Sequence, residues 1–263
     1  MTKHHMTPNG GGGRTETIYG VHPVFEALKA NRRAFRKIYV SSVRAGKMPP
    51  WLKDLSVLAD SRRVPVESVS SSRLGSLSGT DGHQGIAARV DPYPLSVIDD
   101  LIGDQTSMHR FLLLLDHVVD PHNFGALVRT AHCAGVQGII VPKDRSAPPT
   151  PAVSKVSAGA LEHVPMARVT NMVNTIKALK KRGIWVIGLD GDARESIFAV
   201  DFPLSLAIVI GGEQKGIRPL VKKHCDRLCA IPQSGKIDSL NASVAGAIAM
   251  YEIYRQRDAS KGS

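Results

Sequence analysis

Five short apolar runs, separated by stretches of helical periodicity, constrain this chain more than any other feature. They are FLLLLD (111–116), GIIVP (138–142), IWVIGLD (184–190), LAIVIGG (206–212) and RLCAIP (227–232). Consecutive large apolar residues are typical of strands that are buried on both faces of a sheet. Helices expected near 124–134, 151–162, 171–182, 216–223 and 240–257 fill the intervals. This alternation predicts an α/β fold, a parallel sheet with helices on both faces.

A smaller α/β unit precedes this pattern. Its expected elements are a helix and a strand within 17–42, a helix over 51–60, and strands in RVPVESV (63–69) and GHQGIAARV (82–90). Residues 91–109 contain two prolines and a short acidic stretch, which indicates a linker. Residues 1–16 lack the apolar core of a signal peptide and are expected to form a disordered leader. The predicted division is therefore 1–16 leader, 17–90 small unit, 91–109 linker and 110–258 large unit.

The charge balance indicates a polyanionic partner. The chain has 34 Lys and Arg against 23 Asp and Glu, a formal net charge of +11. Such an excess favours nucleic acid or an anionic membrane surface, and no apolar run reaches the ~18 residues of a membrane span. Residues 1–90 contain fourteen Lys and Arg against six Asp and Glu. The NRRAFRK run (31–37) is a candidate for RNA docking, and a solvated helix end is the alternative.

Three cysteines form no disulfide framework, which predicts a reducing, cytoplasmic setting. His224, Cys225 and Cys229 lie close together in sequence, but no second pair of ligands follows at zinc-site spacing. We interpret these cysteines as small apolar core residues and predict no metal site.

Polar residues cluster at the ends of three predicted strands. The clusters are DPHNFGALVRTAHCAG (120–135), IVIGGEQKGI (208–217) and IPQSGKIDSLNASVAGAIAMYE (231–252). The carboxyl ends of parallel strands share one edge, where ligands bind in open α/β sheets. We therefore expect Asn123, Glu213, Ser239 and Asn241 to share one site, and helix capping is the simpler alternative for each.

The second and third clusters indicate the class of ligand that binds at this edge of the sheet. GGEQKG (211–216) matches neither the dinucleotide fingerprint nor the P-loop. Its glycines would let the backbone approach a flat group closely, and the long loop after Ile231 is typical of a functional loop. These features favour an enzyme with a nucleoside-like ligand between glycine loops.

The three clusters resemble the three motifs of the SpoU branch of the SPOUT methyltransferases. The matching residues are Asn123, Gly125 and Arg129–Ala131 in the first motif, Gly211, Glu213 and Gly216 in the second, and Ile231, Pro232, Gly235, Ser239–Asn241 and Ser243–Ala245 in the third. YGVHPVFEAL (19–28) and HQGIAA (83–88) resemble the substrate-binding module of the subgroup that methylates a guanosine ribose in 23S rRNA.

The resemblance implies methyl transfer from S-adenosylmethionine to a ribose 2′-hydroxyl, and the most similar subgroup implies a guanosine of 23S rRNA as the substrate. A tRNA ribose methyltransferase and a non-catalytic RNA-binding protein of the same fold are the alternatives. The resemblance also implies a deep trefoil knot, which is an exception to the rule against threaded chains. It further implies a homodimer whose substrate site is completed across the subunit interface. The residues that it assigns to the cofactor are Gly211, Gly212, Gly216, Ile231, Gln233, Leu240 and Asn241.

The catalytic residues implied by the resemblance are Asn123, Arg129, Glu213, Ser239 and Asn241. Members of this family are often described with the arginine as the base that deprotonates the hydroxyl. A neutral guanidinium is costly at pH 7 because its pKa exceeds about 12. We expect Arg129 instead to pair with phosphate or with the developing alkoxide.

The last helix carries an apolar stripe that predicts more than one packed face. Leu240, Val244, Ala247, Ile248, Tyr251 and Tyr254 recur at helical spacing. One face of this helix must cover the sheet, and another would be free to contact a partner subunit.

Overall fold

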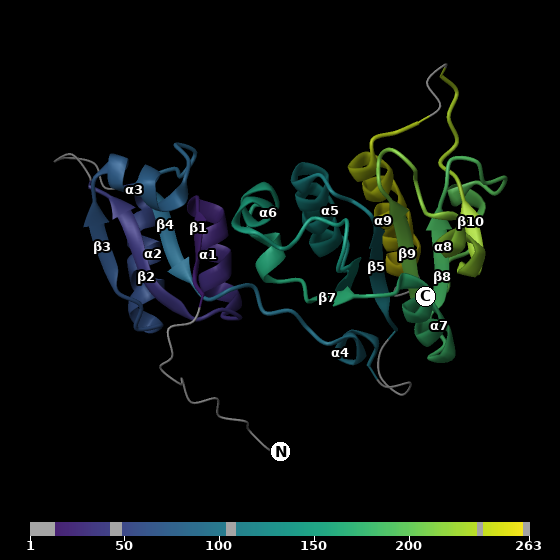
Figure 1. Cartoon of the computed structure of the whole chain (residues 1–263), viewed down its shortest axis with the longest axis horizontal. Helices are drawn as coiled ribbons and strands as arrows, with labels where there is room; N and C mark the ends of the chain where they lie inside the picture. The colour runs from purple at the N-terminus through teal and green to yellow at the C-terminus, as the bar shows by residue number, and fades with distance from the viewer. Residues whose placement is uncertain (1–13, 43–48, 104–108, 236–238, 260–263) are drawn as a thin grey trace.

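The computed structural model describes residues 14–42, 49–103, 109–235 and 239–259, which form two β-sheets flanked by helices (Figure 1). The strands are β1 Glu16–Tyr19, β2 Phe35–Ser41, β3 Val66–Val69, β4 Ile86–Val90, β5 Phe111–Asp116, β6 Gly138–Pro142, β7 Met166–Val169, β8 Trp185–Leu189, β9 Leu206–Gly211 and β10 Arg227–Cys229. The α-helices are α1 Val21–Ala30, α2 Pro50–Ser61, α3 Ser71–Ser78, α4 Ile98–Ile102, α5 Pro121–Cys133, α6 Pro151–Val156, α7 Met172–Lys181, α8 Pro219–His224 and α9 Ala242–Ala259. Two 3₁₀-helices are η1 Ala160–Glu162 and η2 Ile197–Ala199.

The larger sheet has the order β10-β8-β9-β5-β6-β7, and all its described pairings are parallel. Its central strand β5 is buried along its whole length. Phe111, Leu113 and Leu115 pack on the side of α5 and α9, whereas Leu112 and Leu114 pack on the side of α4, α7 and α8. The predicted parallel sheet with helices on both faces is therefore confirmed, and it explains why FLLLLD has no polar alternation.

The strand order creates a switch point between β5 and β9. From β5 the chain proceeds outward through β6 to β7, and it then crosses to β8 and returns inward to β9. Asp116 pairs with Gly211 at this point, and helices leave the two strands in opposite directions, which opens a crevice at their carboxyl ends. The predicted trefoil knot stays a prediction here, because the segment that would thread it includes residues 236–238, outside the described residues.

The smaller sheet has the order β1-β4-β2-β3, with β1 and β2 antiparallel to β4 and β3 parallel to β2. Its core lies between the sheet and the helices α1 and α2. Strands β1 and β7 and helix α3 were not predicted. β1 and β7 have only four residues each, too few for a periodic pattern to stand out. β1 starts at Glu16, so the last residue of the expected leader belongs to the sheet.

The predicted linker is packed against the larger unit. Its expected acidic helix is α4, whose Leu101 and Ile102 are buried under the sheet. Tyr93 is also buried and donates its hydroxyl to the carbonyl of Val164 at 2.5 Å, and the Ser96 N–H donates to Met166. Within the described ranges, no helix combines the length and apolar character needed to cross a bilayer.

The junction of the two units corrects the prediction for the NRRAFRK run. Arg33 is 4% exposed and donates to both carboxylate oxygens of Glu162, at 2.8 and 3.0 Å, and to Glu16. Arg32 donates to the Tyr93 hydroxyl and to backbone carbonyls of the larger unit, including Val164. Both arginines therefore join the two units (β1 and α1 lie beside α6 in Figure 1). The RNA-docking prediction for Arg32 and Arg33 is wrong, and so is the solvated alternative, because their charges are satisfied inside the protein.

Replacing Arg33 by Met is expected to lower the free energy of unfolding by about 3–5 kcal/mol, because Glu162 would keep a buried charge without its partner. Burial already raises the pKa of the Glu162 carboxyl, and Arg33 only partly offsets this. Urea unfolding measures the effect. Arg36→Met is the matched control, since its ion pair with Asp91 is exposed and is worth below about 1 kcal/mol. Equal losses in the two variants would contradict the junction role.

Candidate active site

A buried acid at the tip of β5 holds the crevice together. Asp116 has no exposed surface, and its carboxylate accepts from the backbone N–H of Arg218 at 2.9 Å and from its guanidinium at 2.8–3.2 Å. It also accepts from the ring of His117 at 3.0 Å. Because Arg218 ends the glycine loop that follows β9, this ion pair ties the loop to the neighbouring strand. The acid directly after FLLLL was the sequence signal for this anchor, which the sequence analysis did not assign.

The glycine loop 211–216 is folded tightly onto the chain itself. A Cβ on Gly211 would overlap the backbone of Gly216 and Ile217, and one on Gly212 would overlap the carbonyl of His117. Gly216 has φ of +58°, and its N–H donates to Gly212 at 2.9 Å. Close backbone approach explains these glycines, but it is an approach of the chain to itself, whereas the prediction was an approach to a flat ligand. The turn leaves one side of the loop open to a ligand.

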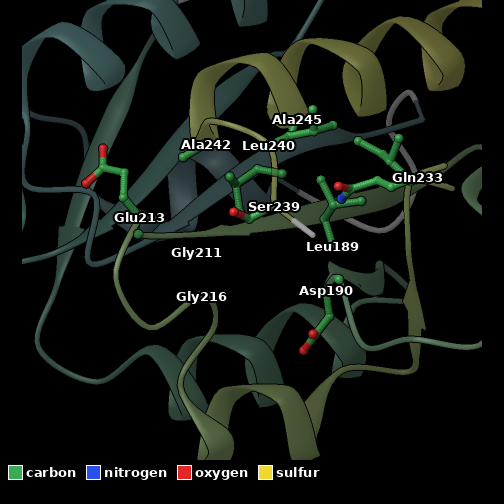
Figure 2. Close-up of a pocket in the computed structure, with 14 residues that line it drawn as sticks. Leu189, Asp190, Gly211, Glu213, Gly216, Gln233, Ser239, Leu240, Ala242 and Ala245 are labelled. Carbon is green, nitrogen blue, oxygen red and sulfur yellow. The ribbon is translucent and has the colours of Figure 1, made fainter. Parts of the chain in front are cut away.

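A cavity of about 210 Å³ lies at the carboxyl ends of β8 and β9 (Figure 2). The lining residues are Leu189, Asp190, Gly191, Ile210, Gly211, Gly212, Glu213, Gly216, Ile231, Gln233, Ser239, Leu240, Ala242 and Ala245. The walls combine aliphatic side chains with glycine backbone, and carboxylates stand at two edges. Figure 2 shows Glu213 at one edge and Asp190 at another, with Ser239 and Leu240 in the centre of the view and Gln233 on the side away from Glu213. Such a lining suits a flat apolar ring with polar groups at its ends.

The structure brings together most of the residues predicted to bind the cofactor. Six of them, all except Asn241, line this cavity, and so do Glu213 and Ser239 from the catalytic set. Sequence reasoning missed Leu189, Asp190 and Gly191 after β8. Their signal was available, because IWVIGLD ends a parallel strand at the same edge. The Asp190 carboxylate forms an ion pair with Lys222, which fixes its place in the wall.

A chain of side-chain hydrogen bonds joins the three motifs beside the cavity. Asn123, in the first turn of α5, donates its amide to the carboxylate of Glu213. Its carbonyl oxygen accepts from the amide of Asn241 at 3.0 Å. The Oδ1 atom of Asn241 accepts from the N–H groups of Ser243 and Val244 at 2.9 and 3.3 Å. Asn123 thus contacts two residues that lie 90 and 118 positions further along the chain, as a shared site requires.

Capping and site formation are combined at Asn241. Its hydrogen bonds to Ser243 and Val244 are those of a helix N-cap, so Asn241 has the capping role that was the alternative to a shared site. The cap uses only Oδ1, which leaves the amide free to hold Asn123. At the start of α5 the cap is Asp120, whose carboxylate accepts from the N–H of His122. Asn123 is thereby left for the site.

Arg129 does not join this contact chain. It lies six residues beyond Asn123 on α5, about 9 Å along the helix, and lines a second hollow between the two units. Its side chain is exposed and has no hydrogen bond or ion pair with any described residue. Gly125, between them, lets α5 pack closely on α6, because a Cβ there would meet the side chain of Val156 at 2.7 Å. The first motif therefore serves helix packing as well as the site.

Cys225 and Cys229 pack into the core as predicted, whereas Cys133 is exposed. Burial raises the pKa of the Cys225 and Cys229 thiols to about 12, so both are protonated at neutral pH. Within the part of the chain that the structure describes, no three His, Cys, Asp or Glu side chains gather in a way that could hold a metal ion.

Comparison with known proteins covers both units. The family model described as "SpoU rRNA Methylase family" matches residues 110–251, and the one described as "RNA 2'-O ribose methyltransferase substrate binding" matches residues 17–96. The crystal structure of the SpoU methyltransferase AviRb from Streptomyces viridochromogenes in complex with the cofactor AdoMet superposes with a TM-score of 0.78. It is 23% identical and covers 93% of this chain and 91% of that one. This likeness shows the fold.

Two relatives extend over nearly the full length. The Bacillus subtilis protein YacO, whose name assigns it to the TrmH family without choosing between tRNA and rRNA, is 40% identical over 92% of this chain and 96% of its own length. The 23S rRNA (guanosine-2'-O-)-methyltransferase RlmB of Pseudomonas putida is 39% identical over 94% of this chain and 98% of its own length. This chain therefore belongs to the SpoU family of rRNA methylases.

Proposed function

We propose that this protein transfers a methyl group from S-adenosylmethionine to the ribose 2′-hydroxyl of a guanosine in 23S rRNA. The observation that carries the proposal is the contact chain from Glu213 through Asn123 to Asn241 at the rim of the cavity. A non-catalytic RNA-binding protein would have no need to keep these three side chains in register. The full-length similarity to RlmB supports the 23S rRNA substrate.

The cavity fits the cofactor by chemistry. Its aliphatic residues Leu189, Ile231 and Leu240 suit the faces of an adenine, and the glycine backbone between them can hydrogen-bond the ring edge. The carboxylate of Glu213 stands at the rim, where a sulfonium charge would be favoured. When bound, the cofactor supplies an electrophilic methyl group.

The residues of this chain prepare the ribose hydroxyl. Asn123 and Asn241 fix one another and would orient the ribose, while Ser239 on the cavity wall offers a hydroxyl for a further hydrogen bond. The hydroxyl oxygen held there would receive the methyl group that the cofactor supplies, and its proton would pass to solvent or to a phosphate of the RNA. Arg129 would stabilise the developing negative charge, because a guanidinium donates strongly and stays charged.

The direct test is mass spectrometry of ribosomal RNA and tRNA from a strain that lacks the gene. Loss of one 2′-O-methylguanosine from 23S rRNA, restored by purified protein and S-adenosylmethionine, is the expected result. Loss of a methylated tRNA nucleotide instead would select the tRNA alternative, and no change in either RNA would contradict the proposal. We place the reaction in the cytoplasm, in line with three free cysteines.

A homodimer through α9 is part of the proposal. The helix buries Gly246, Ala249 and Met250 against the sheet. Its opposite side exposes Val244, Tyr251 and Tyr254, each by 41–49%. Ala247 and Ile248 are half-buried between the two sides. A helix with a second apolar side supports an isologous contact with another copy.

Changing Val244 to Asp is expected to convert a dimer to a monomer at micromolar concentration, because it would bury a carboxylate in the contact. Light scattering measures the mass. Val57→Asp, at an exposed valine of α2, is the matched control and should leave the mass unchanged. Mixing an Arg129→Ala protein with an Asn241→Ala protein tests the shared site, since recovered activity requires both chains. A monomeric mass for the unaltered protein would contradict the dimer.

A further inference from the structure

A second hollow, of about 390 Å³, lies between the two units beside the proposed methylation site. Helix α1 contributes His22 and Glu26, and helix α5 contributes Arg129, His132 and Cys133. The segment 157–163, which includes η1, completes the lining with Ser157, Ala158, Ala160 and His163. The hollow is thus formed jointly by the unit that matches the substrate-binding model and the unit that matches the methylase model.

The walls of the hollow are held in place by the protein. The Nε2 atom of His163 lies 2.8 Å from the Glu26 carboxylate, which also pairs with Lys29 at 2.9 Å. Gly159, with φ of +85°, lets its turn press against α1, because a Cβ there would meet Glu26 at 2.6 Å. Ala158 also adopts a positive φ, of +52°. A non-glycine residue in this conformation is maintained only where the surrounding packing fixes it, so the hollow is formed before any ligand binds.

Two features of the lining are left without a use inside the protein. Arg129 is exposed and has no ion pair with any described residue, so its guanidinium is available to an anion. His132 is exposed and stacks on His163 with ring centroids 5.1 Å apart and planes 18° from parallel. Burial and the neighbouring His163 lower the pKa of His132, so its ring is mostly neutral at pH 7. A cation beside a neutral aromatic surface is the combination that binds unpaired nucleotides of RNA.

We propose that this hollow binds an unpaired nucleotide that neighbours the methylated one, with its base on the His132 ring. Arg129 would hold the phosphate that joins the two nucleotides, which lies beside the reacting 2′-hydroxyl. The inference rests on the proposed function, because it assigns a second subsite to the same RNA. Asn123 and Arg129 are about 9 Å apart along α5, so the hollow is adjacent to the site of the methyl acceptor but distinct from it. Glu26 and His163 then act through His132 by fixing the ring.

The test compares His132→Ala with His132→Phe in the full chain. The affinity for a fluorescent, unmethylated 23S rRNA transcript is measured first, because it does not depend on turnover. Loss of base stacking is expected to weaken RNA binding and to raise KM about tenfold, with kcat less affected. The Phe variant keeps an aromatic face and should recover to within about threefold. Calorimetry should give an unchanged affinity for S-adenosylmethionine, since His132 does not line that cavity.

His224→Ala serves as the matched control, since it removes an exposed histidine from α8. RNA affinity that is unchanged in His132→Ala would overturn the subsite, and so would a Phe variant as weak as the Ala variant. A protein that binds RNA with this pattern but methylates none would leave the subsite standing and contradict the proposed function. If the unaltered protein methylated RNA and His132→Ala had no effect, the proposed function would stand and the subsite would be contradicted.

Discussion

Replacing Arg129 by Ala is expected to lower kcat for methyl transfer roughly a hundredfold to a thousandfold, the usual cost of losing a donor to developing negative charge. The affinity for S-adenosylmethionine should stay within a few-fold, because Arg129 does not line the cofactor cavity. The free energy of unfolding should change by less than about 0.5 kcal/mol, since the side chain is exposed and unpaired among the described residues. Single-turnover rates at saturating RNA measure the chemical step apart from RNA binding.

The Arg129→Lys variant separates charge from geometry. A lysine keeps the positive charge but loses the planar fork that binds a phosphate or alkoxide through two donors. We therefore expect it to recover little of the lost rate. Near-normal turnover by this variant would show that a point charge is sufficient, and the orienting role proposed for the guanidinium would then be wrong.

Changing Asn241 to Asp is expected to lower kcat roughly a hundredfold, the scale of a misplacement of about 1 Å in an active site. In the unaltered protein the side-chain amide of Asn123 lies between the Glu213 carboxylate and the side-chain amide of Asn241. With carboxylates on both sides, its oxygen must face one of them. The contact chain would therefore open on one side of Asn123, either at residue 241 or at Glu213.

The same change should leave stability almost unaltered. The cap of α9 uses Oδ1 of Asn241, and a carboxylate caps a helix as well as an amide does. Asn241→Ala is the control, because it removes cap and contact together and should cost about 1 kcal/mol in addition. Thermal unfolding and kcat, measured on both variants, distinguish the two roles. If Asn241→Asp retained full activity, the contact chain would have no part in catalysis.

Five of the six strands of the larger sheet, its two covered faces and the edge that carries the site could be predicted from the sequence. These features follow from local rules: five apolar runs have strand length, and ligands in such sheets bind at the strand ends. The glycines of the loop 211–216 lie at the end of a strand and were predictable for the same reason. The wall residues Ile231 and Leu240 were identified through the resemblance to the SpoU motifs.

Which charged and polar side chains pair inside the protein, and which remain available to a ligand, became clear only from the three-dimensional packing. Arg33 and Glu162 are 129 positions apart, and no local pattern distinguishes a buried arginine from one that faces RNA. Asn241 has the sequence of an ordinary helix cap, and its second bond to Asn123 exists only because α5 and α9 pack side by side. Arg129 shares a motif with Asn123, yet Arg129 lines the second hollow whereas Asn123 contacts Glu213 beside the first. Local sequence fixes the period and the ends of each element, whereas pairing of distant side chains depends on how those elements pack.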